Sequence, residues 1–330
     1  MAYLQNGVSN TVISDARSGN FANVTIQNAG SLVVDFAHTF QGTVSGYVSG
    51  GYSRLDTIDK FPFATDTNAT NIARLTQARG QAAGCSSDTH GYTTGGFINP
   101  PVATVNTIEK FAFAADSQSY RAGSLAAARY CNAGQSSTTY GYNSGGYNFP
   151  GVGLVNTIEK FTFFADQNGT IVGNLSASRY FLTGQSSTTH GYSSGGLPGA
   201  SNVVDKFPFA TDSNATDVGD LTQARGGSAG QSSTVSGYTS GGYFGSPVTY
   251  TNTIDKFPFA SDNNATDVGD LTVGRGRTSG QSSTASGYTS GGNNASNLNT
   301  IDKFPFASDG NATDVGDITR TNHSPAGQQD

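Results

Sequence analysis

The stretch Thr57-Ile58-Asp59-Lys60-Phe61-Pro62-Phe63 decides the fold, because the same phrase returns five more times along the 330-residue chain. Apolar and polar residues alternate within it at a period of two, which is typical of a half-buried β-strand. Its proline favours a strand end or an edge strand. The later copies follow at intervals of 46 to 50 residues and begin at Thr107, Thr157, Val203, Thr253 and Thr300.

Two further phrases keep the same period. The phrase Leu-x-x-x-Arg ends at Arg79, Arg129, Arg179, Arg225 and Arg275, with a looser copy at Arg320. The phrase Gly-Tyr-x-x-Gly-Gly begins at Gly46, Gly91, Gly141, Gly191, Gly237 and Gly287. We expect each unit to supply four short antiparallel strands. Four strands in a unit of about 50 residues, without helical periodicity, predict a β-propeller.

The order of these phrases resembles the kelch repeat. After Arg225 come a small-residue strand, a strand ending in Gly241-Gly242, a variable loop, the strand phrase with Phe257, and a second Arg at Arg275. The resemblance covers about residues 40–330 and implies an all-β, six-bladed kelch-like β-propeller with four antiparallel strands per blade. Kelch repeats usually carry Tyr and Trp at the aromatic positions, whereas this chain has Phe and no Trp. The chain therefore resembles a divergent branch of the kelch family.

The two ends of the chain predict how the ring closes. Residues 320–328 form the beginning of a first strand whose Gly-Tyr-x-x-Gly-Gly partner is missing, and Thr43–Gly51 supplies that partner. One C-terminal strand joined to N-terminal strands would complete the last blade and remove exposed sheet edges.

The propeller is then predicted to span residues 37–330, preceded by an N-terminal β arm at residues 1–36. Within this arm we expect strands at Phe21–Gln27 and Ser31–Phe36. The arm either packs on the propeller or docks the ring onto a larger assembly.

Composition excludes several classes of protein. Charged residues make up 12% of the chain and the net charge is -6, without the Lys/Arg cluster that nucleic-acid binding needs. The sequence has no apolar run of about 18 residues, which membrane insertion would need. The N-terminus does not resemble a secretory signal. The two cysteines, Cys85 and Cys131, do not have metal-site spacing. We therefore expect no nucleic-acid partner, no membrane insertion and no cofactor.

The charged residues follow the repeat. All six Lys residues occupy one repeat position, and both Glu residues, Glu109 and Glu159, stand where other copies have Asp. We interpret these as structural pairs between neighbouring units. His90 and His190 share a repeat position two units apart, which does not favour a metal cluster. The sequence contains no nucleophile elbow, phosphate loop or dinucleotide motif, so we predict that the protein is not an enzyme.

One face of the predicted propeller carries acidic turns. Oxygen-bearing side chains recur at every second residue there, as at the start of a calcium loop, but the bidentate Glu of such a loop is missing. The alternatives are a calcium site and ordinary Asx turns. The candidate ligands are Asp212, Asn214, Asp262, Asn264, Asp309 and Asn311.

The opposite face carries the loops that vary in length, and function is commonly specified in such loops. Exposed aromatic residues there suit stacking on sugars or packing on another protein, although they could also only cap the ends of the blades. The candidate binding residues are Phe97, Tyr130, Tyr147, Phe149, Tyr180, Phe181, Tyr243 and Phe244.

The near-identity of the repeats carries a second resemblance. The phrase KFPFATDSNATDVGDL at residues 206–221 returns almost unchanged at residues 256–271 and 303–318. It is similar to propeller repeats of bacteriophage structural proteins, especially those of marine phages. This resemblance implies a non-enzymatic virion protein of the tail or another exposed appendage, which contacts other virion proteins or a host-surface glycan or protein and oligomerises through assembly. A cellular lectin-like or scaffold kelch protein is the alternative, and a propeller enzyme is a distant one.

Overall fold

The computed structural model describes residues 24–27, 31–34, 41–52 and 55–330, and the chain divides into two compact units, residues 1–38 and 39–330. In the first unit, β1 (Val24–Gln27) pairs antiparallel with β2 (Ser31–Val34). These strands lie within the two that were predicted for the arm. The turn between them and the predicted boundary at residue 36 lie outside the described residues.

The second unit is a six-bladed β-propeller, as predicted. Each blade is an antiparallel sheet of four strands, and the described residues contain no helix. No helix of the described chain is thus long and apolar enough to cross a membrane. The innermost strands of neighbouring blades contact one another around the centre: β6 (Ala83–Ser86), β12 (Ala133–Ser136), β18 (Thr183–Ser186), β22 (Ala229–Ser232), β28 (Ser279–Ser282) and β32 (Ala326–Gln329).

The other three strands of each blade come from the repeated phrases. The second strands carry the Gly-Tyr phrase: β3 (Ser45–Ser49), β7 (His90–Thr94), β13 (Tyr140–Ser144), β19 (His190–Ser194), β23 (Ser236–Ser240) and β29 (Ser286–Ser290). The third strands carry the Lys phrase and, where it has a proline, end on it: β4 (Thr57–Pro62), β10 (Thr107–Ala112), β16 (Thr157–Thr162), β20 (Val203–Pro208), β26 (Thr253–Pro258) and β30 (Thr300–Pro305). The outer strands are β5 (Thr70–Arg74), β11 (Tyr120–Ser124), β17 (Thr170–Asn174), β21 (Thr216–Asp220), β27 (Thr266–Asp270) and β31 (Thr313–Asp317).

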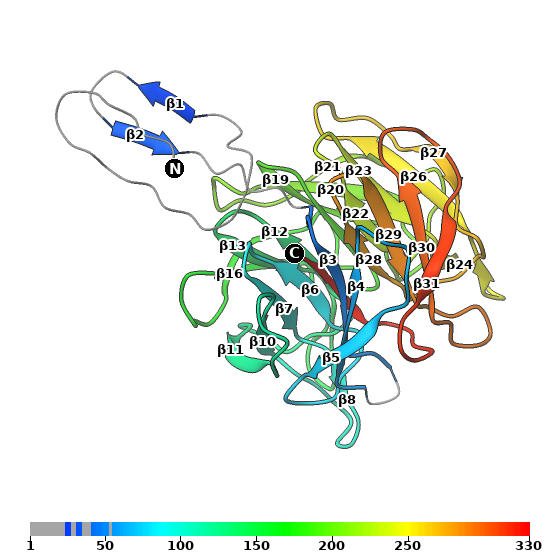
Figure 1. The fold of residues 1–330 in the computed structure, drawn as a ribbon, viewed down its shortest axis with the longest axis horizontal. Coiled ribbons are helices and arrows are strands. Elements are labelled where there is room, and N and C mark those ends of the chain that lie inside the picture. The colour runs from blue at the N-terminus through cyan, green and yellow to red at the C-terminus, as the bar shows by residue number, and fades with distance from the viewer. Residues whose placement is uncertain (1–23, 28–30, 35–40, 53–54) are drawn as a thin grey trace. The chain divides into compact units, whose positions relative to one another are not determined.

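One blade joins the two ends of the propeller. The C-terminal strand β32 pairs with β3, in a register that runs from Gly46 opposite Gln329 to Ser49 opposite Ala326. The sheet order is therefore β32-β3-β4-β5. In Figure 1 the red C-terminal strand lies beside the blue β3. This confirms the predicted closure by one C-terminal strand with N-terminal strands.

Neighbouring blades pack through the same aromatic contact at each of six interfaces. The tyrosine of the Gly-Tyr phrase lies against both phenylalanines of the next blade; the Tyr192 ring, for example, stacks on Phe259 at a centroid distance of 4.9 Å and lies 5.4 Å from Phe257. The glycine of the phrase leaves room for the first phenylalanine, because a Cβ on Gly237 would lie 2.3 Å from the Phe257 ring. The six tyrosines are Tyr47, Tyr92, Tyr142, Tyr192, Tyr238 and Tyr288.

The inner strands approach so closely that their central residue must be glycine. A Cβ on Gly134 would meet the Gly84 carbonyl oxygen at 2.1 Å, and the same contact recurs around the ring. The strands surround a polar channel of about 140 Å³. Serine hydroxyls link neighbouring strands there, as where the Ser136 amide donates to Ser186 Oγ at 3.0 Å. These bonds satisfy backbone donors that would be costly to bury unpaired.

Three short hairpins that the sequence analysis did not predict extend from the loops between second and third strands. They add antiparallel pairs of two residues each. The pairs are β8 (Phe97–Ile98) with β9 (Ala103–Thr104), β14 (Tyr147–Asn148) with β15 (Gly153–Leu154), and β24 (Tyr243–Phe244) with β25 (Thr249–Tyr250). We call the face of the propeller that carries these loops the loop face, and the opposite face, with the acidic turns, the turn face.

Replacing Gly134 with alanine is expected to destabilise the propeller by about 2 kcal/mol or more, because the methyl group would collide with a backbone oxygen that cannot move alone. Thermal unfolding of Gly134→Ala and Gly310→Ala measures this. Gly310 is the matched control, since a Cβ there would meet nothing within 4 Å. Equal melting temperatures for the two variants would contradict the close approach of the inner strands.

Deleting residues 326–330 is expected to lower the melting temperature and to produce aggregates, because β3 would lose its partner and become an open edge. Size-exclusion chromatography and thermal unfolding of the truncated chain test this. A monomeric product that melts with the full-length protein would show that the closing strand is dispensable.

Candidate functional site

The lysines form a ring of ion pairs on the turn face. Each Lys Nζ pairs with the Asp Oδ1 of the next blade's turn at 2.6–3.5 Å, and Lys303 with Asp66 completes the circle. This confirms that the lysines serve pairing between units, although their partner is the turn aspartate and not the acid of the Lys phrase itself. Exposed pairs of this kind contribute little individually. We assign them to the scaffold.

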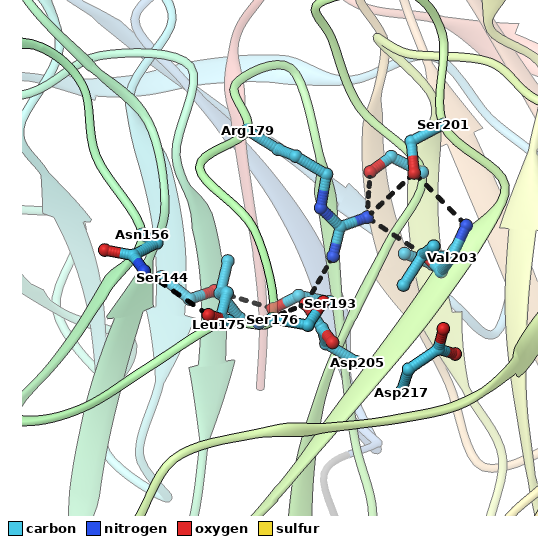
Figure 2. Close-up of polar contacts among 12 residues, drawn as sticks. Ser144, Asn156, Leu175, Ser176, Arg179, Ser193, Ser201, Val203, Asp205 and Asp217 are labelled. Carbon is cyan, nitrogen blue, oxygen red and sulfur yellow. Dashed lines mark hydrogen bonds and ion pairs between the residues drawn. The ribbon is translucent and has the colours of Figure 1, made fainter.

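The acid of the Lys phrase instead pairs with the arginine of the Leu-x-x-x-Arg phrase, in five fully buried ion pairs. Figure 2 shows one of them: Arg179 reaches Asp205 and also donates to the Val203 carbonyl at 3.1 Å. Because each arginine lies on the connector that leaves one blade and each acid lies in the next blade, the pair fixes two blades together. The pairs are Arg79 with Glu109, Arg129 with Glu159, Arg179 with Asp205, Arg225 with Asp255 and Arg275 with Asp302.

The sixth interface, where the ring closes, has no such arginine. Arg320, the looser copy in the sequence, is exposed, and Asn322 occupies the arginine position instead. Asn322 donates to the Gly50 carbonyl at 2.7 Å, as Arg129 does to the equivalent Gly145 carbonyl. Among the described residues, Asp59 accepts hydrogen bonds from Thr319 and Asn71. The closing interface is therefore the one where a buried carboxylate has no cationic partner among the described residues.

The calcium candidates are engaged in bonds between blades. Asp212, Asp262 and Asp309 are the partners of lysines in the ion-pair ring. Asn214, Asn264 and Asn311 each accept a hydrogen bond from a backbone amide of the preceding blade at 3.0 Å. The described residues hold no group of three or more His, Cys, Asp or Glu side chains that could bind a metal. Calcium binding stays a prediction, and these bonds are what a bound ion would have to replace.

His90 and His190 begin second strands on the turn face, and neither touches the loop face. Each Nδ1 lies 2.7–2.8 Å from the hydroxyl of the preceding threonine. Burial, reinforced by the neighbouring Lys110 and Lys206, lowers the pKa of both imidazoles below the usual value.

On the loop face, six of the eight predicted aromatic residues form one continuous series of ring contacts across blades, which we call the aromatic arc. Successive centroids lie 5.2–5.9 Å apart, a separation typical of favourable ring pairs. The backbone sets this spacing, because the connector and the loop of each blade pair directly, as where Tyr130 and Tyr147 exchange two hydrogen bonds of 3.0 Å. In order, the arc contains Phe97, Tyr130, Tyr147, Tyr180, Phe181 and Tyr243.

The arc leaves out two residues of the predicted set, Phe149 and Phe244, and a third, Tyr243, is more buried than predicted. Phe149 is 42% exposed at a loop tip, and neither it nor Phe244 makes a ring contact with the arc. Tyr243 belongs to the arc but is 8% exposed, and burial raises its pKa to about 12. Phe149 is thus available to a partner, whereas Tyr243 mainly supports its neighbours.

A ring of six residues surrounds the mouth of the channel on the loop face, and we call it the mouth ring. Each member donates its backbone amide to the carbonyl of the previous member, so six hydrogen bonds close a circle. All six have positive φ, which glycine adopts freely but other residues adopt at a cost of about 1 kcal/mol or more. Five of the six nevertheless carry a side chain: Gln81, Cys131, Phe181, Gly227, Arg277 and Ser324.

Sequence reasoning missed Arg277, which lies beside the aromatic arc. Its guanidinium carbon is 5.5 Å from the ring centroids of both Phe181 and Tyr243, within the range of a cation–π contact. Burial, and to a smaller extent the positive charge of Arg277, lower the pKa of the nearby His323 to about 4. The signal in the sequence was an arginine two residues beyond the repeated Arg275, at a position where no other unit has a cation.

In comparisons with known proteins, the chain matches no protein-family model and no curated protein sequence.

Replacing Arg275 with asparagine copies the closing interface at a second position and is expected to destabilise the ring by about 3 kcal/mol, because Asp302 would be buried without its cation. The reverse change, Asn322→Arg, supplies the missing cation to Asp59 and is expected to raise the melting temperature. Thermal unfolding measures both. The interpretation would fail if the two variants shifted the melting temperature in the same direction.

Proposed function

We propose that the protein is a non-enzymatic binding component of a virus particle, in the tail or another exposed appendage, and that its loop face contacts other virion proteins or a glycan or protein of the host surface. The aromatic arc is the observation that carries the proposal. It spans four blades and has five half-buried rings beside the buried Tyr243, and half-buried rings offer flat apolar surfaces with little conformational entropy to lose on binding.

The distribution of charge supports a role in binding. The recurring Lys, Arg, Asp and Glu residues are engaged in ion pairs and hydrogen bonds that hold blades together. The loops of the loop face differ between units in length and in sequence, and these differences change neither the Tyr–Phe contacts nor the inner glycines. A scaffold of constant interfaces thus presents one variable surface, which is the usual arrangement of a recognition protein.

The virion assignment is the finer part of the proposal and rests on the sequence. The near-identical repeats resemble propeller repeats of bacteriophage structural proteins, and the order of their phrases resembles the kelch repeat. Mass spectrometry of intact, purified virus particles that carry this protein tests the assignment. Its absence from such particles would remove the virion location but leave the loop face as a binding surface.

The double change Tyr147→Ala, Phe149→Ala is expected to weaken attachment to the particle or to a host-surface ligand at least tenfold, since aromatic anchors contribute about 2 kcal/mol or more. Phe164→Ala is the matched control, because Phe164 is 79% exposed but lies on the turn face. Binding to a glycan array and incorporation into particles are the two readouts. The proposal would be contradicted if the control lost both glycan binding and incorporation, or if the double variant kept both.

A further inference from the structure

The mouth of the channel combines features that point to a ligand. A cavity of about 60 Å³ lies within the mouth ring and is lined by Arg277, Phe181, Asn132 and Thr278, among others. Asn132 Oδ1 and Thr278 Oγ1 are buried there and have no hydrogen-bond partner in the part of the chain that the structure describes, and their residues are 6% and 8% exposed. Unsatisfied buried polar atoms are rare, and each asks for an explanation such as a missing ligand.

The cation at this mouth is also unmatched. Among the described residues, no carboxylate lies within ion-pair distance of Arg277, whereas Arg275 two residues earlier has Asp302 at 2.9 Å. The six connectors that form the mouth contain no Asp or Glu at all: residues 75–82, 125–132, 175–182, 221–228, 271–278 and 318–325. The mouth therefore favours an anion, although the chain as a whole is acidic.

The backbone supports the same conclusion from a different direction. Glycine at the mouth ring would relieve the positive φ, and Gly227 shows that the ring accepts it. Arg277 instead has φ of 57° and places its guanidinium between two rings. Strained side chains that persist in this way gather at binding and active sites.

We infer that the channel mouth binds an anionic substituent, a sulfate or carboxylate, of an acidic polysaccharide. Arg277 would contact the anion through charge-assisted hydrogen bonds, Thr278 would donate a further one, and Asn132 Oδ1 would accept from a sugar hydroxyl. The substituent would enter the cavity, and the ring of Tyr180, which contacts Phe181 at the cavity wall, would stack on the sugar that carries it. This inference rests on the proposed function and names the class of ligand for the same face.

The test compares dextran sulfate, alginate, neutral dextran and poly-glutamate as probes of the purified full-length protein, at low and at moderate salt. We expect one or both anionic polymers to bind and dextran to bind at least tenfold more weakly. The two polymers distinguish sulfate from carboxylate recognition. If neutral dextran or poly-glutamate bound as tightly as the anionic polysaccharides, the assignment to an acidic polysaccharide would be overturned.

The deciding variant is Arg277→Gly, which removes the guanidinium and relieves the backbone. We expect it to weaken polymer binding at least tenfold while the melting temperature stays equal or rises, so that misfolding cannot explain the loss. Arg320→Gln is the control, because Arg320 is an exposed cation on a mouth connector outside the mouth ring. Equal losses in both variants would mean that general charge, and not this site, binds the polymer.

The outcome also separates this inference from the proposed function. If Tyr147→Ala, Phe149→Ala abolishes attachment to the particle or host surface while Arg277→Gly has no effect on any probe, the loop face functions in binding and the anion site is wrong. If Arg277→Gly abolishes polymer binding while particle incorporation is unchanged in the aromatic variant, the anion site stands and the arc does not serve assembly.

Discussion

Six copies of one contact between neighbouring blades hold this protein together, and every other feature has to be compatible with them. The contact places a tyrosine of one blade against two phenylalanines of the next, with a glycine in each partner strand to admit the ring. Because the ring must close, a change in the angle or spacing of the blades at one interface would have to be accommodated at the others. This explains why the repeats are so alike: the residues that make the interface have almost no freedom to differ.

Much of the fold was predictable from the sequence, because phrases that recur every 46 to 50 residues indicate the number of blades and the order of strands within each. The six Lys phrases gave the number of blades, and the incomplete copies at the two ends gave the closing strand. The looser copy at Arg320 followed the residue type, whereas the backbone places Asn322 at the position of the repeated arginine. The short hairpins escaped prediction because loop residues such as Asn148 and Gly153 pair without any alternating pattern.

The candidate site was predictable only in part. Strand alternation assigns the variable loops to one face, so the choice of that face needed no coordinates. The neighbours of Arg277 come from connectors and loops as far apart as Phe181 and Tyr243, and ring closure alone brings them together. Burial of Tyr243 likewise depends on blades that no local pattern describes. Contacts between side chains of different blades are thus the part of a propeller that a repeat pattern does not predict.

The place of β3 has a mechanical consequence. The chain enters the propeller at β3, which is hydrogen-bonded to β32 on one side and to β4 on the other. A pull on the segment that precedes residue 41 would therefore load a strand held by two ladders at once, and would have to shear both before the blade opened. Attachment through that end would make the ring a tether that resists force, because both ladders of β3 would carry the load.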